Sequence, residues 1–250
     1  MNGPIHIVLD KSYLQGCRSS DLHEIAEKHR FLLCAEAFHE VVSSPENEMK
    51  GCVRKLLALN GRVDLLDHNG TLLKYEIENK RSCKPLSHHI LPLALNPDWN
   101  FSFPQSAIET VTEFNDYWEV QRPKTFDEIV KEIISTCGKI PPVQVASQRD
   151  AVLKAYALLR SSHLPLPSAI SEDWAIYRRL QVDLIAACEY MDSFQDGQFC
   201  IREERKAHNQ IDFRVIIAAC LAGGVATRDR LIRRYFQLLC PEGVLYWLEG

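Results

Sequence analysis

Short apolar runs alternate with longer periodic segments at the start of the chain. Residues 5–9 form a β-branched apolar run that ends at an acid, and residues 31–34 form a second run. Segments with helical character follow each run, at residues 19–29 and 36–44. Short apolar runs of this kind predict buried strands, and the periodic segments predict helices. The first 45 residues therefore predict a β-α-β-α order, which is typical of a parallel sheet with crossover helices.

The next segment continues the pattern and then changes in character. Residues 62–67 predict a third strand, followed by a turn at His68-Asn69-Gly70. Leu73, Tyr75 and Ile77 alternate with polar residues after this turn, which favours a further strand. On such a strand, Glu76 and Glu78 are expected to face solvent.

The middle of the chain predicts helices. Residues 80–103 are irregular and contain several prolines, and four helical segments follow, at residues 104–120, 125–138, 147–161 and 171–191. The last of these carries apolar residues at helical spacing from Trp174 to Met191, which indicates a face buried in the core.

The C-terminal part returns to the α/β pattern. It predicts a buried helix from Asp212 to Leu221, a strand at 225–227, an amphipathic helix from Leu231 to Leu239 and a last strand at 244–248. The fold class that follows is a Rossmann-like three-layer α/β/α fold with a central, mainly parallel sheet. We expect one domain over residues 1–250, with a mainly helical insertion at about residues 104–192.

Composition and charge narrow the class of protein. The chain has 250 residues, of which 46% are hydrophobic and 25% are charged, so a disordered or low-complexity chain is excluded. The formal net charge of -4 argues against a dedicated basic arm for nucleic acid. The apolar run at residues 215–226 is shorter than the roughly 20 residues that a membrane span needs, and no signal peptide is evident. Nine cysteines without a CxxC pair predict buried thiols, so we expect a cytoplasmic location.

Four acids stand where a parallel sheet places its functional residues. Asp10 follows the first strand, and Asp229 follows the strand at 225–227. Glu40 lies on the second helix, and Asp212 is expected to open the buried helix that precedes that strand. Ligands bind at the carboxyl ends of strands in open α/β sheets, near the point where strand order reverses. Any single acid here is explained by a helix cap or a solvated charge, but the set predicts a site.

The same segments carry a resemblance to a known family. The stretches HIVLDKSYL, AFHEVV and IDFRVIIAACLAGGVATRDRLIRRYF, followed by PEGVLYW, resemble the PIN domain, a family of metal-dependent nucleases. The resemblance covers roughly residues 5–67 and 205–248, and the helical insertion is additional to the minimal form of the family. It implies that Asp10, Glu40, Asp212 and Asp229 are catalytic metal ligands and that Thr227 is a hydroxyl that supports the site.

Elementary electrostatics agrees with a metal at these positions. Converging carboxylates repel and raise one another's pKa values, and a bound divalent cation offsets this cost. Carboxylate oxygens are hard ligands that suit Mg²⁺ or Mn²⁺, with the number of ions open between one and two. Lys11, Arg228 and Arg230 lie beside the acids in sequence and are expected to bind substrate phosphates. Arg233 and Arg234 are expected to form the solvated face of an amphipathic helix.

These features predict a metal-dependent phosphodiesterase. An endoribonuclease is the first expectation, as the effector of a toxin–antitoxin or phage-defence system, with RNA favoured over DNA because of the family resemblance. The alternatives are a catalytically inactive PIN-like binding or scaffold module and a DNA-directed, structure-specific nuclease. The expected partners are nucleic acid and, through the helical insertion, a second copy of the chain or another protein; no membrane partner is expected.

Overall fold

A six-stranded sheet forms the centre of the protein. The computed structural model describes residues 5–59, 61–93, 131, 135, 138, 141–159, 165–191, 194–195, 198–199 and 203–249. The strand order is β4-β3-β2-β1-β7-β8, and all neighbouring strands are parallel except β4, which is antiparallel to β3. These strands are β1 (His6–Leu9), β2 (Arg30–Cys34), β3 (Val63–Leu66), β4 (Ile90–Pro92), β7 (Gly224–Thr227) and β8 (Val244–Trp247). A separate antiparallel pair consists of β5 (Phe194–Gln195) and β6 (Gln198–Phe199).

Helices connect and cover the strands. In the N-terminal part they are α1 (Lys11–Gly16), α2 (Ser19–Lys28), α3 (Ala35–Val42), α4 (Glu46–Ala58) and α5 (Asn69–Asn79), with a 3₁₀ turn at Leu86–His89. Further along they are α8 (Pro142–Ser147), α9 (Arg149–Leu159), α10 (Ala175–Met191), α11 (Glu203–Ala222) and α12 (Arg230–Leu239).

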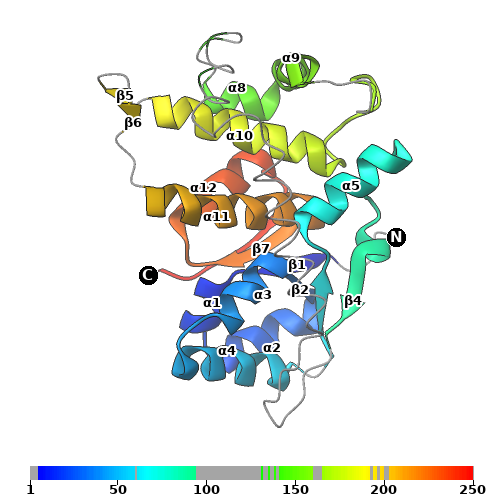
Figure 1. Cartoon of the computed structure of the whole chain (residues 1–250). Coiled ribbons are helices and arrows are strands. Elements are labelled where there is room, and N and C mark those ends of the chain that lie inside the picture. The colour runs from blue at the N-terminus through cyan, green and yellow to red at the C-terminus, as the bar shows by residue number, and fades with distance from the viewer. Residues whose placement is uncertain are drawn as a thin grey trace.

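The connections place helices on both faces of the sheet. The chain moves from β1 through β2 to β3 in one direction and from β7 to β8 in the other, so right-handed crossovers put their helices on opposite faces. Figure 1 shows α2 and α4 on one side of the sheet and α11 and α12 on the other. Ile7, Val8 and Leu9 of β1 are fully buried, as expected for a parallel sheet that is covered on both faces. The predicted three-layer α/β/α class is confirmed.

Two glycines shape the junction between α11 and β7. Gly223 ends the helix with a φ of 85°, a left-handed conformation that favours glycine, and its N–H donates to Ala219 O at 2.8 Å. A Cβ on Gly224 would lie 2.4 Å from Ile7 Cδ1, so only glycine lets β7 approach β1 this closely. The helix ends at Ala222, one residue after the predicted end at Leu221.

The strand predicted after His68 is wrong. Residues 69–79 form α5, which begins where His68 Nδ1 accepts a hydrogen bond from the N–H of Gly70 at 3.0 Å. The alternation of Leu73, Tyr75 and Ile77 is misleading because the fully buried positions of this segment, Leu72 and Glu76, are four residues apart. That spacing is helical.

Helix α11 is longer than the sequence predicted. It begins at Glu203, so Asp212 lies in the middle of the helix and does not open it. Residues 203–210 are nearly all polar, so the first half of the helix has no apolar periodicity from which it could be predicted. The helix predicted at 147–161 corresponds to α9, and α8 lies before it. The helix predicted at 104–120 and most of the one at 125–138 lie outside the described residues.

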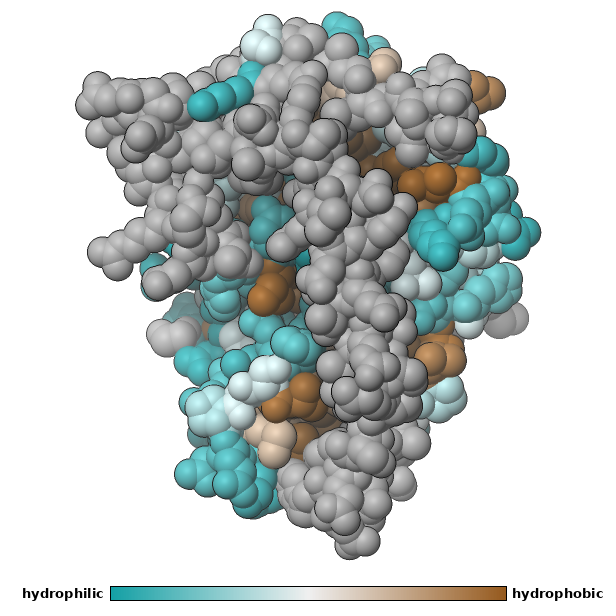
Figure 2. Space-filling model, in the orientation of Figure 1, coloured by the Kyte–Doolittle hydropathy of each residue, from teal (hydrophilic) through white to brown (hydrophobic). Residues whose placement is uncertain are grey.

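The described surface carries scattered apolar side chains. The large exposed ones are Ile5, Leu91, Val143 and Leu166, which come from separate parts of the chain. On the face drawn in Figure 2, hydrophobic residues show as separate areas between hydrophilic ones. Among the described residues, no helix is long and apolar enough to cross a membrane.

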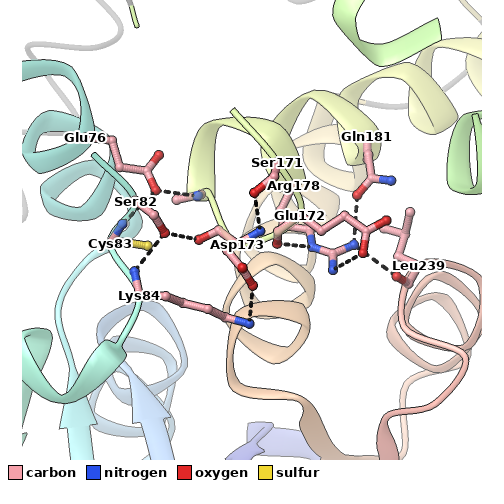
Figure 3. A network of polar contacts seen from close by, with 11 residues as sticks. Glu76, Ser82, Cys83, Lys84, Ser171, Glu172, Asp173, Arg178, Gln181 and Leu239 are labelled. Atoms are coloured by element: carbon pink, nitrogen blue, oxygen red, sulfur yellow. Dashed lines mark hydrogen bonds and ion pairs between the residues drawn. The ribbon is translucent and has the colours of Figure 1, made fainter. Parts of the chain in front are cut away.

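A buried glutamate joins α5 to the start of α10. Glu76 of α5 is fully buried, and its carboxylate accepts hydrogen bonds from the backbone N–H groups of Cys83 (3.1 Å), Ala175 (2.7 Å) and Ile176 (2.9 Å). Ala175 and Ile176 are the first two residues of α10, whose N–H groups have no partner within the helix. Glu76 thus caps a helix that begins about 100 residues later in the chain, as Figure 3 shows. The expectation that Glu76 faces solvent is wrong.

Buried Arg178 makes a second contact on the same helix. Its guanidinium donates to Glu172 O at 2.9 Å, to Gln181 Oε1 at 2.9 Å and to Leu239 O at 3.0 Å (Figure 3). Leu239 is the last residue of α12, so Arg178 connects α10 with the C-terminal end of α12. Helix α10 is therefore fixed to both α5 and α12.

Replacing Glu76 with alanine should lower the stability of the whole protein. The substitution leaves three buried N–H groups without an acceptor, and each costs about 1–3 kcal/mol. We expect the free energy of unfolding to fall by about 3 kcal/mol or more for Glu76→Ala, measured by urea denaturation. Glu78→Ala is the matched control on the same helix, because Glu78 is exposed and its ion pair is with exposed Lys74. Its effect should stay within about 0.5 kcal/mol. Equal effects of the two substitutions would contradict the role of Glu76.

Candidate active site

Two hydroxyl groups orient the first acid. Asp10 directly follows β1 and is 5% exposed. Its Oδ2 accepts hydrogen bonds from Ser12 Oγ and, at 2.8 Å, from Thr227 Oγ1 at the end of β7. Ser12 Oγ in turn accepts from the backbone N–H of Arg228 at 3.0 Å. The carboxylate of Asp10 is therefore held between the loops that follow two neighbouring parallel strands.

Asp229 is fixed by the start of α12. Its Oδ1 accepts hydrogen bonds from the N–H groups of Leu231 at 2.6 Å and Ile232 at 3.0 Å, so the residue is the N-cap of that helix. Its own N–H donates to Thr227 Oγ1 at 2.9 Å. Thr227 therefore contacts both acids, in agreement with the supporting role that the resemblance gives it.

The other two acids come from helices that pack beside β1. Glu40 lies on α3 and is partly buried, whereas Asp212 lies on α11 and is 7% exposed. Helices α3 and α11 pack against each other, and α11 also packs against β1. All four acids thus lie at the carboxyl edge of the parallel strands, next to β1, where the strand order reverses.

The four carboxylates act on one another electrostatically. Burial, together with the negative charges of Asp229, Asp10 and Glu40, raises the pKa of Asp212 to about 8. Burial also raises the pKa of Glu40, together with the charges of Asp10 and Asp229. The pKa of Asp10 is raised by burial and by Asp229, while the hydrogen bonds from Ser12 and Thr227 oppose the shift. Every pair among the four predicted acids is coupled, so the structure brings the predicted set together.

Two basic side chains, Lys11 and His208, act on Glu40. The charges of Lys11 and His208 both lower the pKa of Glu40, against the stronger effect of burial. Lys11 was predicted from its place beside Asp10. His208 was not predicted; it lies four residues before Asp212 on α11, so the signal was its helical spacing to that acid, once α11 is known to extend this far.

The predicted arginines occupy different surroundings. Arg230 is exposed in the first turn of α12. Arg228 lies over Gly16 at the end of α1, where a Cβ would stand 2.2 Å from its Nη1. Arg233 stacks on the ring of Trp247 at 4.6 Å, and Arg234 forms an ion pair with Glu189 of α10 at 2.8 Å. Arg230 is therefore the predicted arginine that is open to a polymer near Asp229.

A second buried polar group lies at the same edge of the sheet. Glu36 Oε1, on α3, accepts hydrogen bonds from the backbone N–H (3.2 Å) and Nδ2 (3.3 Å) of Asn69, and it lies 3.2 Å from His68 Nε2. Burial lowers the pKa of His68, and its Nδ1 accepts from Gly70, as in a neutral ring. Glu36 Oε2 and Asn69 Oδ1 are buried without a hydrogen-bond partner in the part of the chain that the structure describes. Each such acceptor costs about 1–3 kcal/mol. No sequence motif indicated this group.

The donor atoms of the site suit a hard divalent cation. Four carboxylates of reduced solvent exposure are the ligand type that Mg²⁺ and Mn²⁺ prefer. Within the described residues, no three His, Cys, Asp or Glu side chains are grouped so that they could hold a metal ion. The acids therefore suit a metal ion in the type of ligand atom that they offer. Mutual repulsion opposes their closer approach unless a cation lies between them.

Comparisons with known proteins give no relative. No family model matches the chain, and neither a curated protein nor a solved structure matches it. The properties of the site therefore rest on the residues described above.

The coupled acids predict a stability that falls as pH rises. In the folded protein Asp212 keeps its proton up to about pH 8, whereas in the unfolded chain it releases the proton near pH 4. The folded state therefore binds more protons between these values, so its stability is greatest below pH 4 and decreases toward pH 8. One such group contributes a slope of at most about 1.4 kcal/mol per pH unit.

Urea denaturation in EDTA between pH 5 and 8 measures this slope. Asp212→Asn should flatten it and raise the free energy of unfolding at pH 8. Asp183→Asn is the control, because Asp183 forms an ion pair with Arg179 at 2.7 Å and is not among the charges that shift the pKa values of Asp10, Glu40 and Asp212. A slope that Asp212→Asn leaves unchanged would refute the coupling.

Proposed function

We propose that the chain is a divalent-metal-dependent nuclease that hydrolyses phosphodiester bonds, acting on RNA as an endoribonuclease. One observation carries the proposal: Asp10, Glu40, Asp212 and Asp229 are mutually coupled at the carboxyl edge of the parallel strands. Four repelling acids are unfavourable for stability alone, and violations of this kind are expected at functional sites. The resemblance of these segments to the PIN domain supports the same activity and is the basis for choosing RNA.

Each acid has a role in this proposal. Asp10 and Asp229 would be the main ligands of Mg²⁺ or Mn²⁺, Asp212 a ligand from the other side, and Glu40 a ligand directly or through water. When bound, such an ion lowers the pKa of a water molecule and stabilises negative charge on the scissile phosphate. Thr227 would fix Asp10 and Asp229 relative to each other, because its hydroxyl group donates to the Asp10 carboxylate and accepts from the backbone N–H of Asp229.

The basic residues would bind the polymer. Lys11 is close enough to Glu40 to lower its pKa, so its ammonium group can hold a phosphate beside the acids. Arg230 presents an exposed guanidinium one residue after Asp229. Cleavage of cellular RNA by such a site would suit the effector of a toxin–antitoxin or phage-defence system.

A second function is favoured by one observation. The described residues contain no three metal-ligating side chains grouped around one point. This arrangement suits a PIN-like binding or scaffold module whose acids are structural, which would bind a partner independently of metal. A DNA-directed, structure-specific nuclease would use the same acids and differs only in its polymer.

Cleavage of matched RNA and DNA with added Mn²⁺ or Mg²⁺ tests the proposal. We expect the wild-type chain to cleave RNA and EDTA to stop the cleavage. Asp10→Asn and Asp229→Asn should each lower the cleavage rate at least about 100-fold, since each substitution removes a charged ligand. Both variants should fold, because asparagine is a good N-cap and its amide oxygen can still accept the bonds from Ser12 and Thr227. Full cleavage by the double variant would refute the nuclease, and preferential cleavage of DNA would identify the alternative polymer.

Arg230→Ala should weaken binding of single-stranded RNA. Loss of one phosphate contact reduces the slope of log affinity against log salt concentration by about one. Fluorescence anisotropy at several salt concentrations, with the inactive Asp229→Asn chain, gives this slope. Arg54→Ala on α4 is the control, since Arg54 is also exposed but lies on a helix of the opposite face. Equal slopes for the two variants would remove Arg230 from the polymer interface.

A further inference from the structure

Asn69 contacts two helices that carry acids of the site. It begins α5 directly after the β3 strand and is 4% exposed. Its Nδ2 donates to Glu36 Oε1 on α3 at 3.3 Å and to the backbone oxygen of Arg214 on α11 at 2.9 Å. Its backbone N–H donates to the same Glu36 oxygen at 3.2 Å. One amide side chain therefore bridges α3 and α11.

The two contacts stand close to the acids along each helix. Glu36 lies four residues before Glu40, so the two side chains share a face of α3. Arg214 lies two residues after Asp212 on α11. A helix moves as a rigid body over such short distances, so the bridge through Asn69 limits how Glu40 and Asp212 move relative to each other.

The bridge adds fixed geometry to a contact between two packed helices. Helices α3 and α11 pack directly against each other. Apolar packing between the helices is non-directional and does not oppose a small sliding movement. Hydrogen bonds with fixed donor and acceptor positions do oppose it.

We propose that Asn69 and Glu36 form a positioning pair that sets the separation of Glu40 and Asp212 for divalent cation binding. The inference rests on the proposed function, because it assigns these two acids to the cation. Neither Asn69 nor Glu36 is itself a ligand in this proposal. Glu36 serves as a hydrogen-bond acceptor, and its charge is not required.

The unsatisfied atoms of the pair agree with a role beyond stability. Glu36 Oε2 and Asn69 Oδ1 are buried and lack a hydrogen-bond partner among the described residues. Most buried polar atoms in native proteins are paired, and an apolar pair at this place would avoid the cost. An apolar pair could not connect to the oxygen of Arg214.

Titration of the full chain with Mn²⁺ by isothermal calorimetry tests the pair. We expect Asn69→Ala and Glu36→Ala to weaken Mn²⁺ binding about 10- to 100-fold, the usual effect of residues that orient metal ligands. Glu36→Gln should stay within about threefold of wild type, because its amide oxygen still accepts from Asn69. Asn79→Ala is the matched control: Asn79 lies at the other end of α5, is exposed and donates only to Tyr75 O within its own helix.

Thermal unfolding in EDTA separates positioning from folding. Asn69→Ala chains that melt cooperatively and bind Mn²⁺ as tightly as wild type would overturn the pair and leave Asn69 a structural residue. A Glu36→Gln chain that binds as weakly as Glu36→Ala would also overturn it, by making Glu36 a ligand. A wild-type chain that binds no Mn²⁺ would instead overturn the proposed metal site, and the positioning pair with it.

Discussion

Repulsion between like charges is the constraint around which this edge of the sheet is built. The charges of neighbouring carboxylates help to raise the pKa values of Asp10, Glu40 and Asp212, and three kinds of contact hold the four acids. Hydroxyl groups hold Asp10, the first turn of α12 holds Asp229, and the packing of two helices holds Glu40 and Asp212. None of these contacts removes the repulsion. They fix the carboxylates in place in spite of it.

The strand ends could be predicted from the sequence because their signals are local. Asp10 and Asp229 each follow a short apolar run, and the rule that places ligands at the carboxyl ends of parallel strands needs only the order of the elements. Asp212 was found through its distance from Asp229, although its helix begins nine residues earlier than expected. The predicted pattern was correct in these places because burial and secondary structure agree there.

The remaining residues depend on contacts between distant parts of the chain. Glu76 was predicted to face solvent because no residue near it in the sequence indicates its partner. The carboxylate accepts a hydrogen bond from the backbone N–H of Ala175, which lies far along the chain. The segment that contains it showed a period of two in Leu73, Tyr75 and Ile77, yet it folds as a helix because α10 and α11 pack against it. Asn69 has no sequence signal, since its partners lie 33 and 145 residues away. Tertiary pairing of this kind is absent from any local pattern.

The capping of α10 by Glu76 also concerns how the molecule could be divided. A chain engineered without residues 142–191 would lose helix α10, which covers Glu76. It would also lose the N–H groups of Ala175 and Ile176, which donate hydrogen bonds to the Glu76 carboxylate. The exposed face of α5 would then have a carboxylate at the centre of an apolar surface. A boundary between the sheet and the helices from α8 to α10 therefore does not follow the gaps between elements. The burial of Glu76 is compensated by hydrogen bonds from α10. A shortened domain without α10 would therefore need a different residue at position 76.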